Sequence, residues 1–172
     1  METETDKIYD FAKFVLNRND EAIRFSDTKA AIMLTASSLV VTILVDKSVE
    51  ISQTFCSFDL NQKPLLITSL ILLVLGLLIV TISALVGIFP RLTKSKSPGL
   101  IYFGDIHAQT SLDITNKLSS MSSVDLIDQI FQQIQITSEI VYKKFMCIRI
   151  ANIGIISILI GFIGGVLAIF IS

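Results

Sequence analysis

The residues that build metal centres, disulfide frameworks and enzyme active sites are scarce in this sequence. It contains one histidine, His107, and two cysteines, Cys56 and Cys147. One histidine cannot form a histidine pair around a metal within a chain, and two cysteines cannot build a disulfide framework. The motifs GxSxG, GxxxxGK(S/T), HExxH and CxxC are absent,. We therefore expect a protein that is not an enzyme and that holds no metal and no cofactor.

Charged residues are also few, and three long stretches contain none. Only 17 % of the residues are charged, whereas 52 % are hydrophobic and the mean hydropathy is +0.71. The uncharged stretches are 30–45, 64–90 and 150–172, of 16, 27 and 23 residues. A helix rises ~1.5 Å per residue and the bilayer hydrocarbon is ~30 Å thick, so the second and third can cross it. Since no stretch has an interior charge, nothing indicates the ion relay of a transporter.

The first uncharged stretch is short for a crossing. It reaches across if the bilayer thins locally and Lys29 extends toward the headgroups. The alternative is a buried core helix. We predict transmembrane helices at 30–45, 64–90 and 150–172, with an outer loop at 46–63.

Basic residues set the expected orientation. Of the 14 lysines and arginines, 12 lie in segments 1–29 and 91–149, and only two lie in 46–63. Because cytosolic segments near spans are enriched in basic residues, we expect a cytosolic N-terminus and a periplasmic C-terminus. The first 29 residues have no apolar run, so the first span should be its own insertion signal,. The net charge of −1 argues against DNA or RNA as a partner,.

Helical patterns continue the first and third spans into the cytosol. In the arm 1–29, apolar residues recur at three- and four-residue spacings,. Before the third span, Ser122 and Asp125 have the spacing of a capping box, which predicts a helix from about residue 123. A heptad follows it: Val124, Ile127, Phe131, Ile134, Ser138, Val141, Phe145 and Ile148,. We predict one all-α membrane unit over 1–172, in which this seam packs on the arm of its own chain or also builds an oligomer.

Small residues form a stripe along the third span. Gly154, Gly161 and Gly165 lie on one helix face, and the last two make a GxxxG motif,. Such a stripe lets helix backbones approach closely. It favours a homo-oligomer, or packing against the first or second span of the same chain.

The stretch after the second span has a basic turn followed by aromatic residues. Arg91 precedes the turn, and Tyr102 and Phe103 follow it. An aromatic ring can stack on a nucleobase while a nearby cation binds phosphate. The alternative is a short amphipathic element at the membrane surface.

Four motifs together resemble the Pycsar transmembrane effectors (PycTM) of bacterial anti-phage defence. They are RFSDTKAAIML at 24–34, IFPRL at 88–92, IYFGDI at 101–106 and a final helix entering a last span. The resemblance runs from about Asp6 to Ile171. It implies an inner-membrane protein encoded beside a pyrimidine nucleotide cyclase, whose product, cyclic UMP or cyclic CMP, makes the effector impair the membrane and cause cell death.

The resemblance also directs attention to particular residues. There is no appended cyclic-nucleotide-binding β-domain, so a ligand would bind the membrane module itself. Arg91, Tyr102, Phe103 and Asp105 then supply a cation, aromatic faces and a polar edge contact for a cyclic mononucleotide. A constitutive membrane scaffold or a pore-forming, toxin-like protein without a nucleotide is the alternative function.

A second charged group lies where the first span meets the cytosol. Arg24 and Asp27 are three residues apart on one helix face, and Lys29 follows,. They are either interfacial anchors or a polar collar that couples ligand capture to helix movement.

Overall fold

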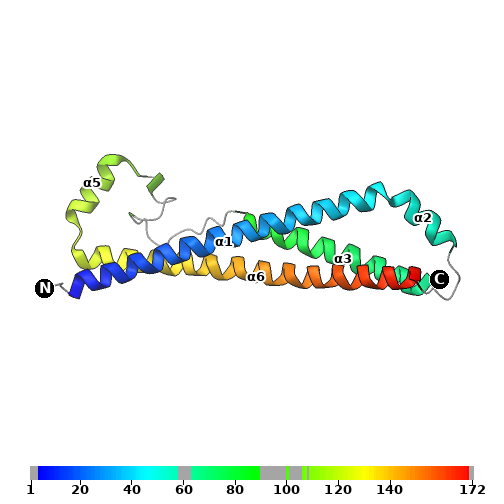
Figure 1. Ribbon diagram of the computed structural model, residues 1–172. Coiled ribbons are helices and arrows are strands. Elements are labelled where there is room, and N and C mark those ends of the chain that lie inside the picture. The colour runs from blue at the N-terminus through cyan, green and yellow to red at the C-terminus, as the bar shows by residue number, and fades with distance from the viewer. Residues whose placement is uncertain (1–3, 58–62, 90–99, 101–105, 108, 171–172) are drawn as a thin grey trace. The chain divides into compact units, whose positions relative to one another are not determined.

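Long α-helices make up the protein. The computed structural model describes residues 4–57, 63–89, 100, 106, 107 and 109–170, and within these ranges there is no β-strand. The helices are α1 (Glu4–Asp46), α2 (Ser48–Ser57), α3 (Lys63–Ile88), α5 (Ser111–Ser120) and α6 (Ser123–Phe170) (Figure 1). The chain is an all-α protein, as the sequence predicts.

Contacts divide the chain into two compact units, to both of which α1 and α6 contribute. Residues 1–25 and 90–143 form one, called here the extension unit. Residues 26–89 and 144–172 form the other, the span unit.

Three helices, α1, α3 and α6, are long and apolar enough to cross a membrane. On α3 the large apolar side chains point outward: Ile71, Leu78 and Ile82 are 51 %, 51 % and 58 % exposed. Exposed apolar surface of this extent is unfavourable in water and favourable in lipid. The prediction of three membrane-spanning helices therefore agrees with the structure.

In the span unit, α3 and α6 meet through small residues. The buried row of α3 contains Ser69, Gly76, Ala84 and Gly87. A Cβ atom added to Gly76 would lie 2.7 Å from the carbonyl oxygen of Gly154, so the two backbones touch. This contact allows the close packing that drives helix association in lipid.

In the extension unit, α1 and α6 run in the same direction. Tyr9 and Leu16 line a hollow with Leu126 and Ile130. Farther along, the amide of Asn19 donates to the hydroxyls of Thr137 and Ser138, at 2.9 Å in each case. Helix α6 therefore packs on the N-terminal arm of its own chain, and the half-buried Asn19 amide specifies the register, as buried polar residues do in coiled coils.

The predicted heptad seam of α6 matches only in part the face that the structure buries. Four of its members are buried or half-buried: Ile127, Ile134, Val141 and Ile148. Val124, Phe131 and Phe145 are 70 %, 40 % and 41 % exposed. The most buried residues repeat at intervals of seven one position earlier, at Ile130, Thr137, Lys144 and Ala151. The seam prediction assumed that apolar side chains mark the contact. Here the buried face of α6 also contains polar side chains that have partners on α1, as Thr137 and Lys144 do.

Capping boxes begin α5 and α6. At α6, Asp125 accepts from the Ser122 hydroxyl and the Ser122 hydroxyl accepts from the Asp125 amide, which confirms the predicted start. At α5, Thr110 and Asp113 make the same exchange. These hydrogen bonds, from the side chain first and the backbone second, lower the pKa of each carboxyl below 3.8,.

Two helices were not predicted. Helix α2 occupies most of what the sequence indicated as the outer loop 46–63, and α5 lies in the segment before residue 123.

Candidate functional site

The side chains predicted to bind a nucleotide cannot be placed. Arg91, Tyr102, Phe103 and Asp105 lie outside the described residues. Their role stays a prediction.

A charged junction joins three helices of the span unit. Lys144 of α6 forms an ion pair with Asp27 of α1. The same ammonium group donates a 3.0 Å hydrogen bond to the carbonyl oxygen of Gly87 on α3. These three residues, called here the junction, connect all three helices that can span a membrane.

Burial makes the junction asymmetric. The Lys144 side chain is 6 % exposed, whereas that of Asp27 is 42 % exposed. An ammonium group withdrawn from water needs both a counter-charge and hydrogen-bond acceptors. Lys144 has Asp27 as its counter-charge and the Gly87 carbonyl oxygen as an acceptor, while the Asp27 carboxylate keeps access to solvent. The lysine therefore depends on the aspartate more than the aspartate depends on the lysine.

The Gly87 carbonyl lies in the last turn of α3, which ends at Ile88. Carbonyl groups in a helix's last turn have no partner within the helix, and the partial negative charge there favours a cation. Helix α3 has no basic residue in its own last turn. Lys144 supplies that cation from α6, so it caps α3 while pairing with α1.

Small residues let the three helices converge at the junction. Ser26 and Ala30, on either side of Asp27, are 2 % and 3 % exposed, and Ala84, one turn before Gly87, is 2 % exposed. A Cβ atom on Gly87 would lie 3.4 Å from that of Cys147 on α6. Bulkier side chains here would separate the helices and leave the lysine unpaired.

The predicted polar collar is only partly in this site. Asp27 belongs to the junction, while Arg24 and Lys29 have exposed side chains on α1. Sequence reasoning missed Lys144, which entered only as a basic residue that sets orientation, and it missed Gly87. The available signal was the row at intervals of seven that contains Ile130 and Lys144, because a lysine on a buried face needs a partner.

The glycine stripe of α6 is used within the chain. A Cβ atom on Gly154 would lie 2.8 Å from the carbonyl oxygen of Gly76, and one on Gly161 would lie 2.7 Å from that of Ser69. Gly165 is less constrained, because its Cβ would meet only the Cβ of Ser69 at 4.0 Å. Gly154 and Gly161 therefore pack against α3, the second predicted span of the same chain. A role of the stripe in an oligomer stays a prediction.

The arrangement holds three helices of the span unit together. In the described part of the chain, no cluster of three or more histidine, cysteine, aspartate or glutamate residues could hold a metal ion. The ion pair and the hydrogen bond of the junction stabilise one arrangement of α1, α3 and α6.

Comparison with known proteins identifies a family. The model of a family described as PycTM, the Pycsar effector protein domain, matches residues 11–172. No curated protein and no solved structure matches.

Proposed function

The chain belongs to the Pycsar effector protein family, and we propose that it impairs the bacterial inner membrane when a partner cyclase produces cyclic UMP or cyclic CMP. Membership implies an effector of anti-phage defence within a cyclic nucleotide signalling system. The proposal adds the nucleotide, the membrane as target, and death of the infected cell as the outcome. No catalytic step is required of the effector.

The junction is the observation that carries a mechanism. Asp27, Lys144 and Gly87 tie together the three helices able to span a membrane. We assign the closed junction to the resting form, in which the spans stay packed and the membrane stays sealed. In the active form the junction opens and the spans rearrange.

A signal opens the junction only if it binds the open form more tightly than the closed form. Shifting the population from 1:99 to 99:1 requires a difference in binding free energy of about 5.5 kcal/mol. One charge-assisted hydrogen bond to a phosphate and one stacked base supply about 2.5 to 6 kcal/mol together. A mononucleotide therefore comes close to switching a single copy, and coupling between copies would supply the remainder.

The proposed ligand groups are Arg91, Tyr102, Phe103 and Asp105. Arg91 follows Gly87 by four residues, just beyond the end of α3 that Lys144 caps. Capture of a cyclic phosphate by Arg91 would act directly on that end of α3. This closeness in sequence supports placing the signal site there.

Copies of the chain are proposed to associate into a homo-oligomer. Outside the predicted spans, several large apolar side chains remain exposed. They are Phe11 and Phe14 on α1, at 60 % and 59 %, and Val124 and Phe131 on α6, at 70 % and 40 %. Such a surface in water favours association.

We propose an inner-membrane location with the N-terminus in the cytosol and the C-terminus in the periplasm. The support is the distribution of basic residues. A periplasmic reporter fused after Ser172 should be active, and one inserted at Ser97 should be inactive. The reverse result would contradict the orientation.

The function is tested by measuring membrane potential in cells that express the chain. The potential should collapse when a pyrimidine cyclase is co-expressed, and it should persist otherwise. A catalytically dead cyclase is the control. Collapse without any nucleotide would favour the constitutive pore-like or scaffold function.

A further inference from the structure

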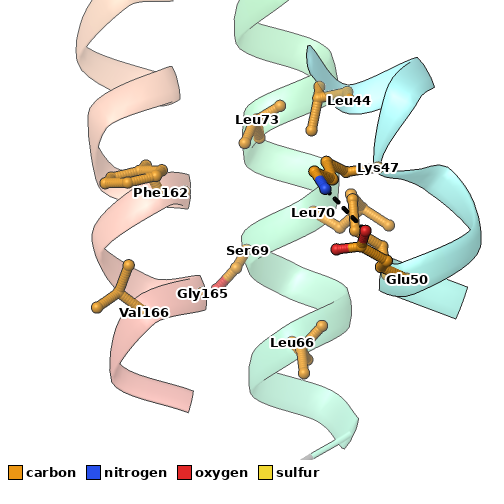
Figure 2. Close-up of a pocket in the computed structure, with 12 residues that line it drawn as sticks. Leu44, Lys47, Glu50, Leu66, Ser69, Leu70, Leu73, Phe162, Gly165 and Val166 are labelled. Carbon is orange, nitrogen blue, oxygen red and sulfur yellow. Dashed lines mark hydrogen bonds and ion pairs between the residues drawn. The ribbon is translucent and has the colours of Figure 1, made fainter. Parts of the chain in front are cut away.

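An apolar groove lies in the span unit at the end away from the junction. Its walls come from α1, α2, α3 and α6, and it encloses about 320 Å³ (Figure 2). Leu66, Leu70 and Leu73 of α3 line one side, and Phe162 and Val166 of α6 line the other. Surfaces of this kind fit a hydrocarbon chain.

The floor of the groove is formed by small residues. Ser69 of α3 faces Gly161 and Gly165 of α6 there. The Ser69 hydroxyl donates a hydrogen bond of 2.8 Å to the carbonyl oxygen of Leu65 in its own helix, so this donor is not available to a ligand in the groove. Within the span unit, Gly161 is needed for backbone contact, whereas Gly165 leaves space that a larger side chain could fill.

Two opposite charges lie at the mouth of the groove. Lys47 and Glu50 both line it and form an ion pair of 2.7 Å (Figure 2). They follow Val45, the last residue of the uncharged stretch of α1, so they lie where lipid headgroups begin,. Their side chains are 51 % and 68 % exposed, and an ion pair so exposed is opened at little cost,.

We propose that this groove is a binding site for one phospholipid with a zwitterionic headgroup that ends in a primary ammonium, as in phosphatidylethanolamine. An acyl chain occupies the apolar part. The phosphate accepts a hydrogen bond from Lys47, and the headgroup ammonium donates one to Glu50. The charge pattern of the mouth, one cation and one anion a helical turn apart, matches the two charges of this headgroup. An anionic headgroup would leave Glu50 facing a like charge.

Tryptophan fluorescence can test the site because the chain contains no tryptophan. Phe162→Trp places a reporter at the groove. Leu167→Trp places one on the same helix at a position that is 52 % exposed and does not line the groove. Each variant is reconstituted in phosphatidylcholine vesicles doped with brominated phosphatidylethanolamine or brominated phosphatidylcholine, whose bromine atoms quench nearby tryptophan.

At Phe162→Trp we expect the ethanolamine lipid to bind about fivefold more tightly than the choline lipid, which corresponds to about 1 kcal/mol. At Leu167→Trp the two lipids should quench equally. In the Phe162→Trp background, Gly165→Leu should abolish the preference by filling the groove. Lys47→Gln and Glu50→Gln should each reduce it, while Lys63→Gln, at the start of α3 and not lining the groove, should leave it unchanged.

Three results would overturn the proposal. One is equal quenching by both lipids at Phe162→Trp, and another is a preference that survives Gly165→Leu. The third is loss of quenching by both lipids as the protein-to-lipid ratio rises, because a second copy would then occupy the groove. Circular dichroism of each variant shows whether it has kept its helices, and only variants that have are compared.

Discussion

Removing either charge of the junction should have unequal consequences, and the structure predicts which is larger. Asp27→Asn removes the counter-charge of Lys144, which is 6 % exposed, and leaves it only neutral acceptors such as the Gly87 carbonyl. Lys144→Met leaves Asp27, at 42 % exposure, hydrated by solvent. Breaking a fully buried ion pair costs about 3 to 5 kcal/mol. Because one partner here is partly exposed, we expect about 2 to 3 kcal/mol for Asp27→Asn.

The lysine variant should be milder. It loses the cap on α3, which is worth about 0.5 to 1 kcal/mol, and it creates no buried charge. The double variant Asp27→Asn with Lys144→Met removes both charges together, so it should cost about as much as Lys144→Met alone. The coupling energy between the two sites then has a magnitude of about 2 to 3 kcal/mol, well above the additivity error of about 0.5 kcal/mol.

Thermal unfolding in detergent, followed by circular dichroism, measures these effects. For a chain of this size about 1 kcal/mol shifts the midpoint by about 2 to 4 °C, so Asp27→Asn should lower it by about 4 to 12 °C. The matched control is Glu139→Gln, which removes an exposed ion pair with Lys143 on the same helix and should shift the midpoint by less than about 3 °C,. In cells without the cyclase, Asp27→Asn should also depolarise the membrane, since it weakens the resting form.

The reasoning would be refuted if Lys144→Met proved as costly as Asp27→Asn, or if the double variant cost the sum of the two. Either result would show that Lys144 does not depend on Asp27. If the Asp27→Asn protein is inserted and folded but the cells keep a normal membrane potential, the junction does not control the change from the resting to the active form.

Three further predictions concern other parts of the chain. Gly154→Ala should destabilise the protein by about 1 to 3 kcal/mol in the same thermal assay, because the added Cβ atom would collide with the backbone of α3,. Gly165→Ala should be nearly neutral, because its Cβ atom has space. Equal effects of the two substitutions would contradict the described contact between α3 and α6. Because hydrogen bonds lower the pKa of Asp125, its cap stabilises the fold above pH 3.8 and is lost as the pH falls through the lowered value,. Circular dichroism should therefore show helix loss on acidification, part of which Asp125→Asn removes; an identical acid titration of that variant would refute the assignment. Arg91→Ala and Tyr102→Ala should insert normally but fail to depolarise cells on signal, the aromatic loss costing about 1 to 3 kcal/mol of binding; a full response in both would mean that the signal is captured elsewhere.

Much of the fold follows from residue patterns, whereas the junction does not. Uncharged stretches identified the helices able to span a membrane, and the spacing of Ser122 and Asp125 marked the start of α6. Half of the predicted seam of α6 lies off the buried face, because that face also contains residues such as Thr137 and Lys144 that no hydrophobic pattern selects. Their burial depends on partners more than a hundred residues away, which a local pattern does not reveal. Helix α5 was foreseeable, since Thr110 and the acid three residues later make a capping box.

The double duty of Lys144 has a consequence for biogenesis. Membrane helices are inserted in the order of their synthesis, so α1 and α3 enter the bilayer while α6 is still to be translated. During that interval neither Asp27 nor the Gly87 carbonyl has the ammonium group that pairs with it in the finished protein. A nascent chain with two spans therefore lacks the contact to which we assign restraint. For a protein proposed to kill its host, translation that stalls before residue 144 would release an unrestrained fragment, and we expect quality-control proteases to act on that fragment first.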